Sequence, residues 1–82
     1  MSYAQAIMRY KGHNVTVKLI GNQIMIDATI YLARVWAKKQ LHTVAKECKI
    51  DVIVANDKFF ISPRNISKFK KKAIPKLQKF RK

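Results

Sequence analysis

The chain has 82 residues, of which 18 are Lys or Arg and four are Asp or Glu, so its formal net charge at pH 7 is +14. Like charge at this density attracts phosphate through long-range steering and counterion release, and nucleic acid is the first partner that it suggests. Because 49% of the residues are hydrophobic and only two are Gly and two Pro, the composition excludes a disordered basic tail and favours one small folded domain.

The first part of the chain indicates a β-hairpin. A short first helix is one interpretation of the run from Ser2 to Met8. From Asn14 to Ile26 hydrophobic residues alternate with polar ones, which is the period of a half-buried strand, and Gly21-Asn22 interrupts the alternation with a tight turn. Asp27 follows the second strand and is the expected N-cap of a helix that begins near Ala28.

The segment from Ala28 to Cys48 should be helical, but it permits two interpretations. Its hydrophobic residues form two stripes, Ala28, Tyr31, Leu32 and Val35, and then Leu41, Val44, Ala45 and Cys48. At about 100° per residue these stripes point in nearly opposite directions on one straight helix, so we favour a bend near residues 35–37 and a helix-turn-helix. The alternative is one long helix with a continuous stripe of Ile30, Ala33, Ala37, Leu41, Val44 and Cys48.

A second hairpin and a basic helix complete the chain. Asp51 to Ala55 and Lys58 to Ile61 read as strands joined by the two-residue turn Asn56-Asp57. Ser62-Pro63 is a helix start, since Pro at the first helical position lacks only an amide that would be unpaired. A buried stripe should follow up to Pro75, where we expect the helix to end or kink; its residues are Ile66, Phe69 and Ala73.

These elements predict a single small α+β domain over residues 1–82. The expected arrangement is winged-helix-like. It comprises a β-hairpin, a helix-turn-helix or one long helix, a second hairpin that acts as a wing, and a basic C-terminal helix over about residues 64–82.

Two segments resemble known DNA-binding families. Ala37 to Phe69 resembles the core of excisionase-type and MerR-like winged-helix proteins, in which a recognition helix, a short hairpin and a last helix with a polar start follow one another. Tyr10 to Ala33 is similar to the opening hairpin and helix of the phage and viral KilA-N and BRO-N modules. Either resemblance implies a gene-control protein of a mobile element or virus, such as a transcription regulator or a recombination directionality factor.

The outward face of the helix from Lys38 to Glu47 is the candidate for sequence readout. Lys and His can donate to guanine acceptors, and Thr can contact a thymine methyl or a phosphate. The residues assigned to this recognition helix are Lys38, Lys39, His42, Thr43 and Lys46. The alternative is a solvated helix face that happens to be basic. Asn56 and Lys58, at the tip of the second hairpin, are the candidates for a wing that reaches a neighbouring minor groove.

The basic C-terminal segment is expected to contact the nucleic-acid backbone. Contacts with phosphate set affinity and carry no sequence information. The residues assigned to this role are Arg64, Lys68, Lys70, Lys71, Lys72, Lys76 and Lys79. Double-stranded DNA is the expected partner, and assembly on DNA as a homodimer or as tandem copies is a further expectation.

The remaining polar residues indicate neither a metal site nor catalysis. His13, His42 and Cys48 match no zinc-ligand spacing, and a lone Cys is more often part of the packing. The four acidic residues offer no general acid and base pair, so we expect no enzyme activity and no cofactor. Trp36 is expected to pack two helices together rather than to stack on DNA.

The sequence also bears on the compartment. The single Cys48 excludes an intrachain disulfide and fits a reducing environment. Met1 to Tyr10 lacks the features of a secretory signal, and no apolar stretch approaches the roughly 18 residues of a membrane span. We therefore expect a soluble protein in the cytoplasm, associated with the nucleoid or in the interior of a host cell.

Two other functions are compatible with the charge. An RNA-binding module would use a basic sheet with exposed rings to stack unpaired bases, although Phe59 and Phe60 lie on opposite faces of one strand and at most one is free. A basic amphipathic segment from Ser62 to Phe80 could instead bind a membrane surface or a partner protein, although Pro75 interrupts its stripe.

Overall fold

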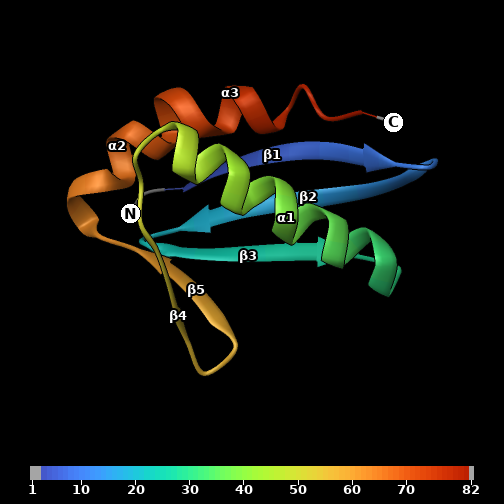
Figure 1. Ribbon diagram of the computed structural model, residues 1–82, viewed down its shortest axis with the longest axis horizontal. Helices are drawn as coiled ribbons and strands as arrows, with labels where there is room; N and C mark the ends of the chain where they lie inside the picture. The colour runs from blue at the N-terminus through green and yellow to red at the C-terminus, as the bar shows by residue number, and fades with distance from the viewer. Residues whose placement is uncertain (1–2, 82) are drawn as a thin grey trace.

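An antiparallel sheet with helices on one face forms the structure, a computed structural model that describes residues 3–81 (Figure 1). The sheet has five strands in the order β1-β2-β3-β5-β4. The strands are β1 (Tyr3–Tyr10), β2 (His13–Ile20), β3 (Gln23–Ala28), β4 (Val52–Ala55) and β5 (Lys58–Ile61). This arrangement confirms the expected α+β class.

The prediction of a short helix from Ser2 to Met8 is wrong over the described residues, because β1 begins at Tyr3. Ser2 lies outside the residues that the structure describes. Ala6 and Met8 alternate with exposed residues and are fully buried, which is a strand pattern. All eight residues of β1 pair with β2. Pairing with a neighbouring strand outweighs the local helix propensity of this segment. The first ten residues alone cannot indicate that such a partner strand exists.

The first predicted hairpin is present as β2 and β3, with Gly21 at a φ of +62° in the turn. Asp27, however, is not the N-cap of a helix. It lies within β3, where its Oδ2 atom is 3.6 Å from the Nζ atom of Lys18 on β2. The strand alternation continues two residues beyond the predicted end, and the N-cap of the following helix is Ile30.

One helix, α1 (Tyr31–Glu47), occupies the region where we favoured two. The helix-turn-helix interpretation is therefore wrong, and the alternative of one long helix is right. Its buried residues are Ala33, Ala37, Leu41, Val44 and Ala45, so the stripe with small alanines faces the sheet. Tyr31 and Leu32, which we assigned to a core stripe, are 76% and 65% exposed. Hydrophobicity alone did not identify which stripe the sheet covers.

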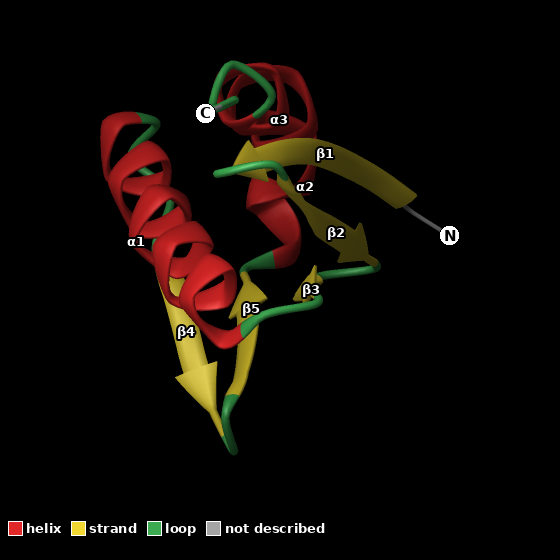
Figure 2. Cartoon of the chain, turned by 90° about the vertical axis from the view of Figure 1, so that its right-hand side faces the viewer, coloured by secondary structure: helices red, strands yellow, loops and turns green. Residues whose placement is uncertain are grey.

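The second hairpin has the predicted strands and turn. Asn56 and Asp57 have φ values of +51° and +61°, as a two-residue type I′ turn requires. β5 pairs with β3 only at the Gln23–Phe60 and Ile24–Phe59 positions. The hairpin consequently diverges from β3 toward its tip (Figures 1 and 2).

The C-terminal helical segment starts at Pro63 as expected. It comprises the 3-10 helix η1 (Pro63–Asn65), α2 (Ile66–Lys68), the π turn η2 (Phe69–Ala73) and α3 (Ile74–Leu77). The N–H of Ile74 donates to the carbonyl of Phe69, five residues earlier. This wide turn precedes Pro75, which lacks an N–H, and the helix continues to Leu77 instead of ending at the proline.

The core lies between the sheet and the two helical segments. Its largest fully buried side chains include Phe69 and Leu77 from the C-terminal segment, Leu41 from α1, and Met8 and Leu19 from the sheet. Trp36 joins α1 to the end of the chain, because its ring centre lies 5.2 Å from that of Tyr10 and 6.2 Å from that of Phe80. No helix within residues 3–81 is both long and apolar enough to cross a bilayer.

Candidate nucleic-acid interface

The positive charge is concentrated in the helical layer, which we define as residues 31–49 and 63–81. Thirteen of the 18 Lys and Arg residues lie in this layer together with one acidic residue, Glu47, a formal charge of +12. The strands and their turns hold four basic residues against three acidic ones, a formal charge of +1, with Lys82 not counted. α1 and α3 contact each other and both contact β1, so these two helices lie on the same side of the sheet (Figure 2).

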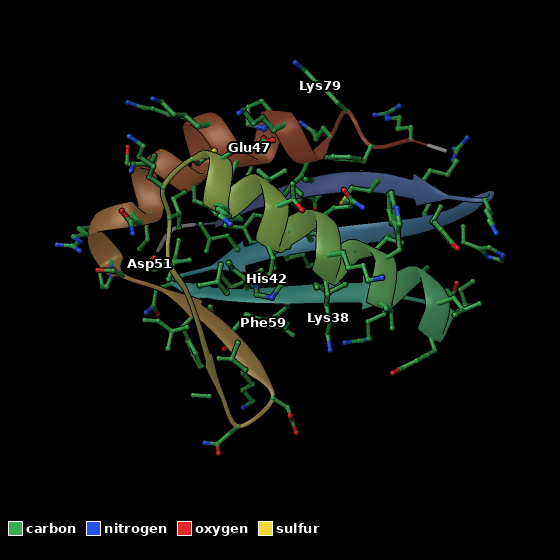
Figure 3. The ribbon with its side chains drawn as sticks, in the orientation of Figure 1. Lys38, His42, Glu47, Asp51, Phe59 and Lys79 are labelled. Carbon is green, nitrogen blue, oxygen red and sulfur yellow. The ribbon has the colours of Figure 1, made fainter. Side chains whose placement is uncertain are left out.

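The five residues assigned to a recognition helix all lie on α1, in two rows. Lys39, Thr43 and Lys46 are exposed and follow one another at i, i+4 and i+7, so they share the outward face. Lys38 and His42 turn toward β5 instead (Figure 3).

The ring of Phe59 on β5 contacts both residues of this second row, Lys38 and His42. The Nζ atom of Lys38 is 5.6 Å from the centre of the Phe59 ring, and the His42 ring meets Phe59 edge to face at 5.8 Å. Both contacts place a basic or polar group at the junction of α1 and the second hairpin. On this part of α1, Lys38 and His42 are therefore held by contacts with Phe59, whereas Lys39, Thr43 and Lys46 face solvent.

Arg34 extends the row of Lys38 and His42 by one helical turn, and the sequence analysis missed it. Together with Lys58 it lines a notch where the second hairpin diverges from β3. The other residues that line the notch are Gln23 to Ile26, Lys38, Asp57 and Phe59. The spacing of four residues from Arg34 to Lys38 was the available signal, but the assumed bend near residues 35–37 concealed it.

The two wing residues lie at the tip of the second hairpin and are exposed. The turn itself accounts for Asn56, since Asn tolerates a positive φ better than most residues. Lys58 is the tip residue with a charge that phosphate would attract, and Asp57 beside it opposes that charge.

The seven residues assigned to backbone contacts lie from η1 to the turn that follows α3. Lys68 is half-buried, and its Nζ atom donates to the carbonyl of Lys49 at 3.4 Å. The other six are exposed: Arg64, Lys70, Lys71, Lys72, Lys76 and Lys79. Lys79 points away from the rest of the molecule (Figure 3).

A depression between the end of α1 and the C-terminal segment gathers three of the residues assigned to backbone contacts, Lys68, Lys72 and Lys76. Four lysines line it, Lys49, Lys68, Lys72 and Lys76, beside Glu47, Cys48 and Pro75. Glu47 accepts a hydrogen bond from Lys76 at 3.4 Å and offsets one of these charges. Lys49 was not assigned a role from the sequence. Its position just after the long helix would have indicated that it lies near the basic residues of that helix.

The groups considered for metal binding do not form a cluster. Within residues 3–81 no three His, Cys, Asp or Glu side chains gather as metal ligands would, and Cys48 is buried. No protein-family model, curated protein or solved structure matches the chain. The helical layer, with its one-sided charge, is thus the feature from which a function can be argued.

Proposed function

We propose that the protein binds double-stranded DNA through its helical layer, in a sequence-preferring or architectural role in gene control. The observation that carries this proposal is the separation of charge, +12 in the helical layer against +1 in the strands and turns. A surface with this excess of Lys and Arg gains free energy from phosphate by releasing condensed counterions.

A duplex fits this layer better than an unpaired strand does. Proteins that bind single strands combine cations with exposed rings in one groove. Here, within residues 3–81, the exposed Phe, Tyr and Trp rings are those of Tyr3 and Tyr31, at 54% and 76%, and only Tyr31 belongs to the helical layer. Phe59 is already occupied by Lys38 and His42. The charge would therefore meet phosphates more readily than it would meet stacked bases.

In this proposal α1 lies along a groove and the C-terminal segment contacts the backbone beside it. The row from Lys39 to Lys46 spans about 10 Å at 1.5 Å per residue, which is roughly three base pairs of B-DNA. Lys70, Lys71 and Lys72 would neutralise phosphates. The second hairpin would act as the wing, with Asn56 and Lys58 reaching a neighbouring groove.

Salt dependence of duplex binding tests the proposal. Fluorescence anisotropy with a labelled duplex of about 20 base pairs should give an affinity that falls linearly on a log-log plot of salt, with a slope near −0.9 for each phosphate neutralised. A single strand of the same sequence and an RNA duplex serve as competitors. Absence of binding at 50 mM salt, or an affinity that salt does not change, would refute the electrostatic premise.

A further inference from the structure

The face of the sheet opposite the helices carries a row of side chains that crosses every strand. Tyr3 on β1 pairs with Ile20 on β2, Ile20 with Gln23 on β3, Gln23 with Phe60 on β5, and Phe60 with Ile53 on β4. Side chains of directly paired residues project from the same face and touch their neighbours. We call this set the cross-strand row: Tyr3, Ile20, Gln23, Phe60 and Ile53.

This face is also where exposed hydrophobic side chains gather. Of the eight large hydrophobic residues that are exposed within residues 3–81, five lie on it by strand alternation, namely Tyr3, Ile7, Ile20, Met25 and Ile53. Exposed apolar side chains that gather on one face mark interaction sites on soluble proteins. The helical layer, by contrast, holds most of the lysines.

The charge of this face points to the kind of partner that can approach it. The outward positions of the five strands hold three cations, Arg9, Lys18 and Lys58, and one anion, Asp27, which lies 3.6 Å from Lys18. Their formal charge of +2 is far below the +12 of the helical layer, so a polyanion is attracted less to this face. A second copy of the chain, which carries +14 in total, meets the least repulsion on this side.

We propose that two copies of the chain pack sheet against sheet through the cross-strand row, with their helical layers on the two outer sides. A twofold axis parallel to the strands and passing over Gln23 would set Ile20 of one copy on Phe60 of the other, and Tyr3 on Ile53. The row is thus complementary to itself, as an isologous interface requires. Stacked sheets of this type pack about 10 Å apart.

The dimensions of the molecule allow an interface of ordinary size. Its two longest extents are 34 and 27 Å, so one face spans at most about 900 Å² in projection. Specific interfaces bury roughly 800 Å² on each partner. Two chains of +14 nevertheless repel each other over a Debye length, so dimerisation should strengthen as salt is added.

Sedimentation velocity on the intact chain tests the dimer. Between about 5 and 100 μM protein, the dimer fraction should rise with concentration, and it should be larger in 0.5 M than in 0.05 M salt. DNA binding has the opposite salt dependence, so the two properties are separable. A chain that stays monomeric at 100 μM in 0.5 M salt overturns this inference and leaves duplex binding untouched.

Neighbouring residues of β4 provide a matched pair of variants. Ile53 and Val54 are 51% and 58% exposed, but Ile53 belongs to the cross-strand row and Val54 lies on the opposite side. Ile53→Thr should raise the dimer dissociation constant about tenfold, because the change occurs in both copies, while Val54→Thr should change it less than about twofold. Thr preserves strand propensity, and circular dichroism verifies folding. Equal effects of the two changes would also overturn the assignment.

Discussion

The Nζ atom of Lys38 lies 5.6 Å from the centre of the Phe59 ring, which couples the middle of α1 to the second hairpin. His42, one helical turn further along, meets the same ring at its edge. β5 pairs with β3 at two positions, and this aromatic contact adds a link between the hairpin and α1. The position of the Lys38 ammonium group therefore depends on a residue of the hairpin.

Phe59→Leu should destabilise the protein by about 1–2 kcal/mol, since Leu retains apolar volume but loses the ring contacts with Lys38 and His42. Urea unfolding measures the change. A double-mutant cycle with Lys38→Met should give a coupling free energy of about 0.5 kcal/mol. Additive effects of the two substitutions would show that the cation and the ring do not interact in solution.

Two triple variants with the same loss of charge test where DNA binds. Replacing Lys70, Lys71 and Lys72 by Gln should weaken duplex binding strongly and lower the salt slope by about 0.9 for each phosphate contact removed. Replacing Arg9, Lys11 and Lys18 by Gln removes the same charge from the strands and their turns and should have a much smaller effect. Anisotropy titrations at several salt concentrations measure both. Equal losses would mean that net charge alone, and not the helical layer, governs affinity.

Much of the fold followed from local signals in the sequence. The turns at Gly21 and at Asn56-Asp57 were predictable because each turn geometry demands particular residues at adjacent positions. The strand β1 was not predictable, since its state depends on pairing with β2. The choice between one helix and two depended on which stripe the sheet would cover, and the small side chains of Ala33 and Ala37 lie on the covered one.

In the candidate site, too, local periodicity was predictable, whereas contacts between residues far apart in the sequence were not. Helical periodicity placed Lys39, His42, Thr43 and Lys46 on one outward face. All four are exposed in the structure, but His42 also contacts Phe59, which periodicity could not indicate. The row on the open side of the sheet could not be found from the sequence, because Tyr3 and Ile53 join it only through the registers of four strand pairs.

Changes on α1 should alter sequence preference as well as affinity. We expect Lys39→Ala with Thr43→Ala to change the ranking of sites selected from a random duplex pool, because these side chains would face base edges. Lys71→Ala with Lys72→Ala should weaken binding to every site about equally, since phosphate contacts carry no sequence information. Sequencing of the bound fractions compares the two. Identical behaviour of the two double variants would exclude base readout by α1.

Asp57 combines a backbone conformation that lowers stability with a negative charge that opposes phosphate binding, and substitution can separate the two. It has a φ of +61°, which disfavours most residues other than Gly, and it lines a notch together with Arg34, Lys38 and Lys58. Asp57→Gly should raise the free energy of unfolding by about 0.5 kcal/mol, because Gly adopts a positive φ without steric cost. It should also tighten duplex binding by removing a negative charge beside three cations.

Asp57→Asn is the control that distinguishes backbone from charge, since it removes the carboxylate and keeps a side chain at the same φ. Duplex affinity should rise in both variants, whereas urea unfolding should show the larger gain in stability for Asp57→Gly. Affinity that is unchanged in both variants would place the notch and the hairpin tip outside the DNA contact. The wing role of Lys58 would then be wrong, while the helical layer would remain the candidate interface.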